Sequence, residues 1–455
     1  MHRQLRIQGK HYDMIKNHLF PGDGMEAVAV ILCGRHRTKD REILTSYQVL
    51  LIPYEECERA PEYVSWKIDR IIPFFEQVEK KNLALVKIHC HPGGTPWFSK
   101  VDDESDAAFF KAAFSWSETE DINASAVMLP NGEIFGRAFL KDLSSVGLDR
   151  ITVAGDNVLI FDKEKKNEIE EFARRTIQAF GDGTYRKLRS LRVGIVGCSG
   201  TGSPVIEQLV RLGIGELVIV DPDEIEHKNL NRILNSGVND VGKAKVLVMK
   251  EAIADIGLPT VVTSFDVNLL ESRDAQEALV SCDIIIGCVD SVEGRYLMSQ
   301  LSNFYVIPYF DLGVRLIANG KGGITTVVGS VNYIQPGMSS LMSRHLITRE
   351  RLESEGLKRK DPENYREQVE QKYISGVNVD SPAVISVNMV IASNAVLEFL
   401  DKLHGFKEDR LARVMVDMVG GCVDNFKESE FEIDPHAEKW AGRGDCKPFL
   451  QMPSL

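Results

Sequence analysis

The chain has 455 residues, of which 44% are hydrophobic and 26% are charged, and its formal net charge is −12. This length is enough for two or three domains with large apolar cores. The acidic balance argues against nucleic acid as the main partner, because phosphate binding requires a basic surface. No apolar run reaches the length of a membrane span, and the first residues lack the apolar core of a signal peptide. The eight cysteines form no C-x-x-C pair, so we expect reduced thiols and a cytoplasmic protein.

The first part of the chain has the alternating pattern of an α/β domain. Its strand patterns cover residues 26–34, 43–53 and 83–90, and residues 63–80 have helical spacing. The last of these strands runs directly into a segment that is rich in histidine, glycine and proline. We expect this α/β domain to span residues 1–160.

Two histidines and a downstream aspartate form a candidate metal centre. In an extended strand, residues two apart share a face, so His89 and His91 can bind one ion together. Asp102 supplies a third ligand and leaves the fourth position open for water, as in catalytic zinc sites. Glu26, near the start of a strand, is the candidate base that takes the proton of that water. Ser99 is placed to donate a hydrogen bond to the oxyanion that forms when a carbonyl is attacked.

The spacing H-x-H-P, six residues, Ser, two residues, Asp resembles the signature of the JAMM (JAB/MPN) metalloproteases. Members of that family cut peptide or isopeptide bonds after the C-terminal glycine of ubiquitin-like proteins. The resemblance implies a JAMM/MPN zinc peptidase domain over residues 1–160. In it, His89, His91 and Asp102 would hold Zn²⁺, Ser99 would stabilise the oxyanion, and Glu26 would be the catalytic acid/base.

The second part of the chain contains the strand, turn, helix and strand of a nucleotide site. A hydrophobic strand over residues 192–196 leads into a glycine-rich turn and a helix, and the next strand, 216–220, ends in Asp221. The helix N-terminus would point free N–H groups at phosphate, and the acid would face a ribose hydroxyl. Ser199 replaces the glycine that lets backbone approach a pyrophosphate, and there is no Gly-Lys-Ser/Thr of a P-loop. The glycines of the turn are Gly197, Gly200 and Gly202.

Charged and amide side chains follow this unit in a fixed order: Asp223, Asn229, Arg232, Lys245 and, at the end of a later strand, Asp290. A dinucleotide dehydrogenase has no need of them. An enzyme that must neutralise a triphosphate while one phosphate is attacked does need them. Asp290 ends a strand that begins near Cys282, and ligands of doubly wound folds gather at that edge of the sheet.

This ordered set resembles the ThiF/MoeB-type adenylating enzymes, whose fold is shared by ubiquitin-activating enzymes. The resemblance implies a Rossmann-like, doubly wound domain over residues 161–455, with a crossover segment at about 336–380 and a C-terminal tail at about 406–455. It also implies ATP and Mg²⁺ as cofactors, and a homodimer in which Arg175 reaches the phosphates of the partner subunit. The resemblance assigns Asp221 to the ribose, Asp290 to Mg²⁺, and Asn229, Arg232 and Lys245 to the phosphates.

The acceptor of the activated group is left open by the sequence. Ser340-Leu-Met-Ser343 stands where many relatives carry half of a cysteine zinc clip, so we expect no structural zinc there. In thioester-forming relatives the catalytic cysteine lies in the crossover segment, and this chain has none between Cys288 and Cys422. Three possibilities follow: the enzyme stops at the acyl-adenylate, it uses a cysteine of the tail as nucleophile, or it forms an oxyester on a serine. The oxyester ranks last, because the sequence shows no base that would activate the serine hydroxyl. The candidate nucleophiles are Cys422, Cys446, Ser339 and Ser340.

These features predict a bifunctional enzyme of a prokaryotic ubiquitin-like pathway. Its zinc peptidase would expose or release a C-terminal glycine, and its second domain would adenylate that carboxylate for a conjugating enzyme. One alternative is activation of a sulfur-carrier protein for a sulfur donor. More remote alternatives are an NAD-dependent oxidoreductase and a non-catalytic binding module for ubiquitin-like proteins. The sequence does not choose between defence and sulfur transfer, or between precursor maturation and deconjugation.

Overall fold

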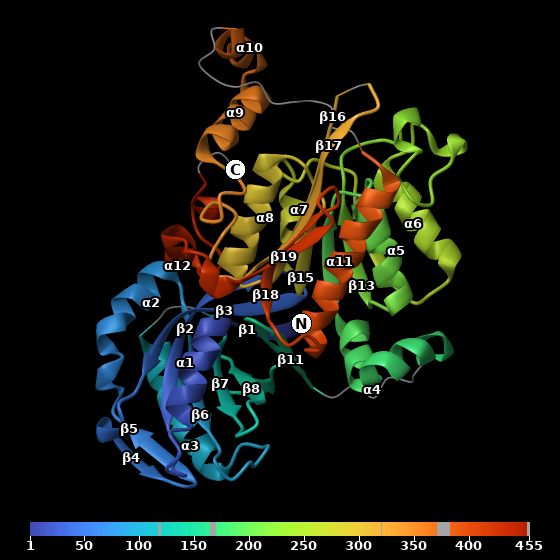
Figure 1. Ribbon diagram of the computed structural model, residues 1–455. Helices are drawn as coiled ribbons and strands as arrows, with labels where there is room; N and C mark the ends of the chain where they lie inside the picture. The colour runs from blue at the N-terminus through green and yellow to red at the C-terminus, as the bar shows by residue number, and fades with distance from the viewer. Residues whose placement is uncertain (117–119, 164–169, 320, 371–382, 453–455) are drawn as a thin grey trace. The chain divides into compact units, whose positions relative to one another are not determined.

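The computed structural model describes residues 1–116, 120–163, 170–319, 321–370 and 383–452 (Figure 1). The chain divides into two compact units. Unit 1 contains Met1–Lys166, Asn303–Val306 and Lys439–Ser454, and unit 2 contains Asn167–Ser302 and Ile307–Glu438. The segment from Lys439, which we had expected in the second domain, therefore groups with the first.

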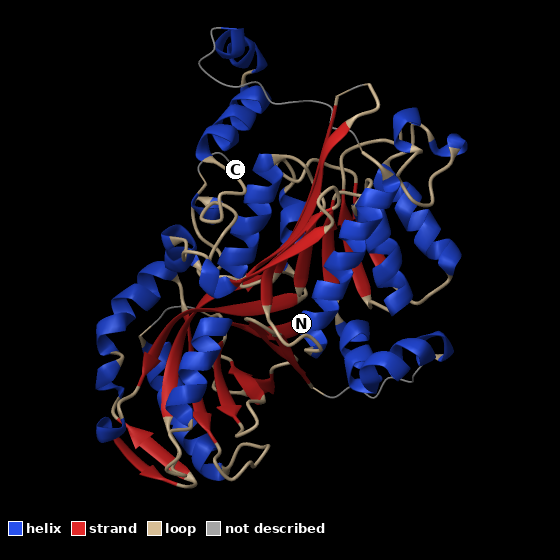
Figure 2. Ribbon diagram, in the orientation of Figure 1, coloured by secondary structure: helices blue, strands red, loops and turns tan. Residues whose placement is uncertain are grey.

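Unit 1 is built on a nine-stranded mixed sheet with the order β11-β10-β1-β3-β2-β6-β7-β8-β9. Its helices and a separate two-stranded hairpin, β4–β5, complete the unit (Figures 1 and 2). The strands are β1 (His2–Gln8), β2 (Val28–Arg37), β3 (Arg41–Leu51), β4 (Cys57–Ala60), β5 (Tyr63–Trp66), β6 (Ala84–Cys90), β7 (Asn123–Met128), β8 (Ile134–Phe139), β9 (Ser145–Gly147), β10 (Arg150–Ala154) and β11 (Val158–Asp162). The α-helices are α1 (Gly9–Leu19), α2 (Phe75–Lys81) and α3 (Lys100–Ser115).

Alternation along the central strands of unit 1 supplies two apolar cores. On β6, Val86 and Ile88 join the cluster that contains α1, and Leu85 joins the cluster that contains α3. Because successive side chains of a strand point to opposite faces, Lys87 and His89 lie on the same face as Leu85. This is the face that α3 covers, so the candidate metal ligands of β6 are turned toward α3.

The helix expected over residues 63–80 is only partly present. Tyr63–Trp66 forms β5, which pairs with β4, and the α-helix α2 begins at Phe75. Pro73 explains the late start, because proline lacks the N–H and clashes in a helix interior. The apolar spacing in this stretch arises from a hairpin and short turns, which periodicity cannot distinguish from a helix.

Unit 2 contains an eight-stranded sheet with the order β14-β13-β12-β15-β16-β17-β18-β19. The first five strands of this order, β14, β13, β12, β15 and β16, pair in parallel, which is the Rossmann order 3-2-1-4-5. The strands β17, β18 and β19 extend the sheet with antiparallel pairing. The strands are β12 (Arg192–Val196), β13 (Glu216–Val220), β14 (Val261–Phe265), β15 (Ile284–Gly287), β16 (Tyr309–Ala318), β17 (Ile324–Ile334), β18 (Leu411–Asp417) and β19 (Cys422–Lys427).

Unit 2 also contains helices, several of which connect the parallel strands of its sheet (Figure 2). They are α4 (Arg174–Ser190), α5 (Gly202–Leu212), α6 (Lys245–Ile256), α7 (Arg273–Val280), α8 (Val292–Tyr305), α9 (Arg349–Lys360), α10 (Pro362–Glu370), α11 (Ile385–His404) and α12 (Pro435–Trp440). α11 packs against α5, β16 and β17. The α/β class predicted from the sequence is confirmed. None of the helices in the described ranges combines the length and apolarity needed to span a membrane.

Candidate metal centre and nucleotide site

Three side chains of unit 1 converge at the end of β6. His89 is on β6, His91 follows it directly, and Asp102 lies in the first turn of α3. The Nε2 atoms of His89 and His91 are 3.1 Å apart. Asp102 Oδ1 is 3.0 Å from His89 Nε2, and Asp102 Oδ2 is 3.4 Å from His91 Nε2. All three residues are buried, and their ligand atoms form a group that could hold one metal ion.

These distances fit a tetrahedral zinc ion. Two ligand atoms that each lie about 2.1 Å from such an ion are about 3.4 Å apart. His91 Nδ1 is 2.8 Å from Thr95 O, so Nδ1 carries a proton and Nε2 is the ring nitrogen that could bind a metal. Burial lowers the pKa of His89, and the charge of Lys87 lowers it further, which favours the neutral imidazole that a metal requires.

Glu26 lies on the same face of the sheet as the two histidines. β2 and β6 pair antiparallel with Val28 opposite His89, so the same register places Glu26 opposite His91. Glu26 is 4% exposed. Burial raises the pKa of its carboxyl group to about 7, and this effect outweighs the charge of His91, which acts to lower the same pKa. A carboxyl group with such a pKa can take up and release a proton at neutral pH.

Ser99 is the N-cap of α3 and shares a capping box with Asp102. Its Oγ accepts a hydrogen bond from Asp102 N at 3.1 Å, and Ser99 N donates to Asp102 Oδ2 at 2.6 Å. The capping box holds the carboxylate of Asp102 in place. Because the Ser99 hydroxyl oxygen accepts this bond, its O–H proton is available to a substrate oxygen. Trp97, two residues earlier in the chain, is 64% exposed.

In unit 2, the glycine turn after β12 is required by close packing. Gly197 has φ +94°, and a Cβ there would lie 2.6 Å from Cys288 O. At Gly202 a Cβ would lie 1.8 Å from Gly197 O, so only glycine lets α5 start this close to β12. At Gly200 a Cβ would lie 2.2 Å from Asn388 Nδ2 and 3.2 Å from Arg232 Cδ. The turn therefore lies against two polar side chains from other parts of unit 2.

Asp221 and Lys245 face each other beside this turn. Asp221 follows β13, and its carboxylate accepts hydrogen bonds from Cys198 N at 2.6 Å and from Asp223 N at 2.9 Å. Lys245 Nζ donates to Asp223 Oδ2 at 2.7 Å and lies 3.8 Å from Asp221 Oδ1. Burial raises the pKa of Asp221, and the charge of Lys245 opposes that rise. A buried cation is thus fixed next to the glycine turn.

Asn229 and Arg232 lie in the loop between Asp221 and α6. Asn229 is 3% exposed, and its Oδ1 accepts from Glu226 N at 3.0 Å, so its amide N–H₂ is the group that can face an anion. Arg232 Nη1 donates to Lys228 O at 2.8 Å. Asn388, on α11, was not selected from the sequence. The signal that could have found it is a polar residue in the apolar start of a helix, Ile-Ser-Val-Asn-Met-Val.

Asp290 is exposed three residues beyond the end of β15. Because β12, β13 and β15 are parallel neighbours, the residues that follow them, among them Gly197, Asp221 and Asp290, belong to one edge of the sheet. The structure also places Glu355 at this edge. Its Oε2 accepts from Val292 N at 2.6 Å, in the first turn of α8. Sequence reasoning missed Glu355, which lies within the expected crossover segment.

A buried polar cluster lies beside the same edge, around Asp311. Asp311 is on β16, opposite Gly287 of β15, and is fully buried. Arg295 binds its two oxygens from Nε at 2.7 Å and from Nη2 at 2.6 Å. Asn332 Nδ2 donates to Asp311 Oδ2 at 3.1 Å. The sequence signal that could have identified Asp311 is an aspartate within the otherwise apolar strand Tyr-Phe-Asp-Leu.

The candidate nucleophiles differ in their access to solvent. Ser339 is 1% exposed and its Oγ donates to Glu428 Oε1 at 2.5 Å, while Ser340 donates to Asp434. Cys422 is exposed at the start of β19, and the thiol of Cys446 donates to Pro448 O at 3.3 Å. The two cysteines are therefore the more accessible candidates, and both serines are held in hydrogen bonds to carboxylates.

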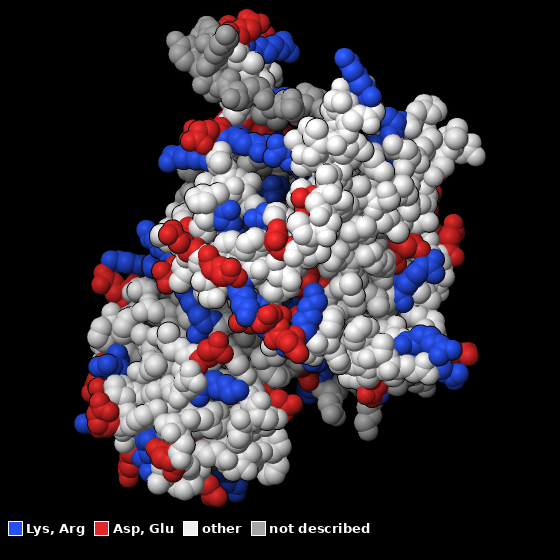
Figure 3. All heavy atoms as spheres, viewed as in Figure 1, with Lys and Arg blue, Asp and Glu red and all other residues white. Residues whose placement is uncertain are grey.

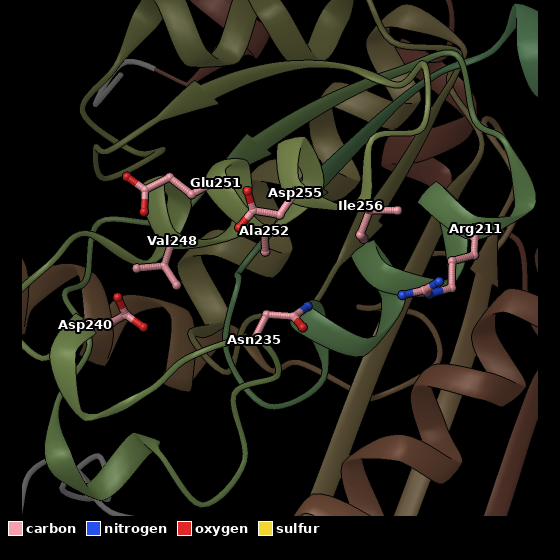
Figure 4. A pocket seen from close by; sticks show the side chains of 8 residues that line it. All are labelled: Arg211, Asn235, Asp240, Val248, Glu251, Ala252, Asp255 and Ile256. Atoms are coloured by element: carbon pink, nitrogen blue, oxygen red, sulfur yellow. The ribbon is translucent and has the colours of Figure 1, made fainter.

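Two further features lie outside these groups. Arg175 is exposed on α4, and its Nη1 donates to Gln178 Oε1 at 2.9 Å. A surface hollow of about 490 Å³ is lined by residues of α5, α6 and the loop between them, including Arg211, Asp240 and Glu251 (Figure 4). None of the nucleotide-site residues named above lines it. Basic and acidic side chains are interspersed over the face drawn in Figure 3, without a continuous basic stripe.

The ThiF family model matches residues 173–434. Among curated proteins, the Adenylyltransferase and sulfurtransferase UBA4 of Eremothecium gossypii is 36% identical over 137 residues, which is 30% of this chain and 31% of that protein. The SAMP-activating enzyme E1 of Haloferax volcanii is 29% identical over 142 residues, 31% of this chain and 52% of that protein. The Ubiquitin-like modifier-activating enzyme 5 of Caenorhabditis briggsae is 28% identical over 166 residues, 34% of this chain and 36% of that protein.

The chain thus spans between about a third and a half of the length of these curated relatives. Among solved structures, E. coli MccB with ATP has a TM-score of 0.44 and 17% identity, and the match covers 57% of this chain and 72% of that one. This structural similarity is too distant to carry an argument.

Proposed function

Because the chain belongs to the ThiF family, we propose that unit 2 is an ATP-dependent adenylyltransferase. Its substrate is the C-terminal glycine carboxylate of a ubiquitin-like or sulfur-carrier protein, the classes of partner that the names of the curated relatives indicate. The observation that carries this proposal is that a glycine turn, a buried lysine beside Asp221, and Asp290 all belong to one edge of the sheet.

Each side chain at this edge has a part in binding ATP. Asp221 accepts from the ribose, because each of its oxygens keeps a lone pair beyond its backbone hydrogen bond. Lys245, Asn229 and Arg232 present donors to the phosphates and stabilise the charge that develops when the α-phosphate is attacked. Asp290 supplies an oxygen ligand for Mg²⁺, which offsets the charge of the departing pyrophosphate.

ATP–pyrophosphate exchange in the presence of a Gly-terminated ubiquitin-like protein from the same genome tests this proposal. Lys245→Ala is expected to lower the exchange rate by about 100-fold or more, since it removes a buried cation from the phosphates. Asp290→Ala is expected to abolish exchange. Lys250→Ala, an exposed position on the same helix as Lys245, is the matched control and is expected to match the wild type. Absence of exchange in the wild type would refute the proposal.

We propose further that unit 1 is a JAMM-type zinc peptidase that acts on the same class of partner. The observation that supports it is the set of three buried ligand atoms at the spacing of a tetrahedral ion, with Glu26 on the same face. His89, His91 and Asp102 would hold the zinc ion, which would supply an activated water molecule for the attack. Glu26 takes the proton of the attacking water and passes it to the leaving amine. Ser99 donates to the oxyanion.

Metal content and peptide cleavage test this second function. The wild type is expected to contain about one zinc ion per chain and to cleave a ubiquitin-like precursor after its glycine, while His89→Ala loses both. Glu26→Gln is expected to keep zinc and lose cleavage. A wild-type chain that binds no zinc would leave unit 1 without this function and would not affect the adenylation proposal.

The proposed assembly is a cytoplasmic homodimer. α11 carries exposed apolar side chains, among them Met389, Val390 and Leu397 at 37%, 40% and 48% exposure, which a second copy would cover. Arg175, exposed on α4, would then reach the phosphates of the partner subunit. Light scattering of the wild type and of Leu397→Glu measures the association, which the charged variant is expected to weaken. A monomeric wild type would contradict it.

A further inference from the structure

A second contact between β6 and α3 lies next to the candidate metal centre. Lys87 is two residues before His89 on β6, and Asp106 is four residues after Asp102 on α3. Lys87 Nζ donates to Asp106 Oδ1 at 2.8 Å, and the two side chains are 2% and 0% exposed. Two residues of a strand span about 6.6 Å and four residues of a helix span about 6 Å. The Lys87–Asp106 ion pair therefore joins β6 to α3 in the same way as the His89–Asp102 contact, about 6 Å further along both the strand and the helix.

Arg137, on β8, ties the same turn of α3 to the sheet. Its Nη2 donates to Asp106 Oδ2 at 2.7 Å, and its Nη1 donates to Asp103 Oδ1 at 2.5 Å. Its guanidinium lies 3.9 Å from the ring centroid of Phe98, the residue before Ser99. Arg137 thus contacts residues on both sides of Ser99 and Asp102.

The buried ion pair lies at the edge of an apolar core. The side of α3 that carries Phe109 and Phe110 packs on Leu85 of β6 in one cluster. Apolar packing alone would hold α3 on the sheet without the cost of removing two charges from water. A hydrogen-bonded ion pair adds a directional constraint on the position of a helix along a strand, which non-directional apolar contacts do not supply. A metal ligand requires such a constraint.

We propose that Lys87, Asp106 and Arg137 are positioning residues for the metal centre, and that they set metal affinity by fixing Asp102 relative to His89 and His91. The inference rests on the proposed zinc site. These three residues do not contact the metal. They hold the N-terminal turn of α3 at the position along β6 that brings Asp102 to His89 and His91. Their substitution is therefore expected to weaken metal binding more than it weakens folding.

Zinc affinity and cobalt spectroscopy of the full chain test this inference. The variants are Lys87→Met, Arg137→Met and, for rescue, Arg137→Lys, with Lys141→Met as the matched control because Lys141 forms an exposed ion pair with Glu120 in the same unit. Zinc dissociation constants come from competition with a chelating dye. The visible absorption of bound Co²⁺ reports ligand geometry, and thermal unfolding reports the fold.

The expected result is about 10- to 100-fold weaker zinc binding and an altered cobalt spectrum in Lys87→Met and Arg137→Met. We expect partial recovery in Arg137→Lys and wild-type behaviour in Lys141→Met. If Lys87→Met does not fold, the Arg137 variants decide, because Arg137 lies at the margin of the core. Folded Arg137→Met protein with wild-type zinc affinity and an unchanged cobalt spectrum would overturn the inference. A wild-type chain without zinc would instead overturn the proposed site itself.

Discussion

Glu26 and Asp102 belong to one buried centre, and their surroundings move their pKa values in opposite directions. Burial raises the pKa of Glu26 to about 7. Burial also acts to raise the pKa of Asp102, but hydrogen bonds with His89 and His91 outweigh it and hold that pKa well below its usual range. Asp102 therefore stays ionised, as its proposed role as a metal ligand requires, while Glu26 can exchange a proton near neutrality, as its proposed role as a general base requires.

The pKa of Glu26 predicts how Glu26→Gln changes stability in the metal-free protein. The folded-state pKa of about 7 lies above the ordinary value of 4.5. Between these pH values the folded chain keeps a proton that the unfolded chain has released, so this group lowers wild-type stability as pH rises, by at most about 1.4 kcal/mol per pH unit. The variant lacks this titration. Its free energy of unfolding relative to the wild type is expected to rise across that range and to level off above it.

Urea unfolding of the two metal-free proteins at a series of pH values measures this difference in the transition of unit 1. A difference that does not change with pH would show that Glu26 titrates at its ordinary value. A bound dication would lower the pKa of Glu26 through its charge, so the pH dependence is expected to shrink when zinc is added.

Residues close in sequence could be grouped from the sequence, and residues brought in by the fold could not. His89, His91 and Asp102 lie within one strand, one loop and one helix turn, so their spacing predicts that they meet, and their ligand atoms do lie together. Asn388 lies more than a hundred residues along the chain from Gly200, which it contacts. Glu355 lies more than sixty residues from Val292, from whose N–H it accepts a hydrogen bond. No local pattern encodes such distances, because tertiary packing sets them.

At the scale of elements, α9 is attached to the start of α8, close to Asp290. Glu355 accepts hydrogen bonds from the backbone N–H groups of Val292 at 2.6 Å and Glu293 at 3.0 Å. Arg359 adds two contacts of 3.0 Å to the carboxylate of Glu293. A carboxylate at a helix N-terminus satisfies free N–H groups and the helix dipole. Part of the expected crossover segment is thereby fixed at the nucleotide edge.

Glu355→Ala is expected to release α9 from α8. The variant loses a cap that is worth about 1–2 kcal/mol, so trypsin is expected to cut α9 at its arginines about tenfold faster than in the wild type. Glu353→Ala, which removes an exposed carboxylate from the same helix, is the control. Limited proteolysis followed by mass spectrometry locates the cuts, and equal rates in all three proteins would contradict this account.

The order of the parallel strands could be predicted from the sequence, and the hairpin of unit 1 could not. Strand, glycine turn, helix and strand form one local unit with a known handedness, so the arrangement of β12, α5 and β13 follows from the motif. β4 and β5 are four residues each and only half-buried. Val64 and Trp66 of β5 pack on apolar clusters of unit 1, so the hairpin leaves an apolar spacing that periodicity cannot distinguish from that of a helix.

At the scale of the whole molecule, the last described segment belongs to unit 1 through backbone contacts. Gly442 O accepts from Gly34 N at 3.2 Å and from Thr45 Oγ1 at 2.9 Å, and Asp445 N donates to Arg35 O at 2.8 Å. A Cβ at Gly34 would lie 2.3 Å from the backbone of the segment. Most of these contacts use glycine and main-chain groups, and the buried apolar residues of the segment, Ala441 and Leu450, are isolated, so the tail has no apolar periodicity from which to assign it.

A chain that ends at residue 438 is expected to have a less stable unit 1. It loses these hydrogen bonds at about 1 kcal/mol each, together with the buried side chains of Ala441 and Leu450, so the free energy of unfolding of unit 1 is expected to fall by at least about 3 kcal/mol. Amide hydrogen exchange of β2 and β3 in the shortened and full chains measures the loss. Lys447→Ala, an exposed position in the segment, is the control. Unchanged protection of β2 in the shortened chain would contradict the prediction.

The two proposed functions together mean that one chain would first expose and then adenylate the C-terminal glycine of a ubiquitin-like protein. The most direct measurement is the intact mass of a precursor with residues beyond that glycine, after incubation with ATP, Mg²⁺ and zinc-loaded protein. We expect trimming followed by addition of AMP in the wild type, trimming alone with Asp290→Ala, and neither with His89→Ala, which still adenylates the pre-trimmed form. Adenylation of that form with no trimming by any variant would contradict the claim.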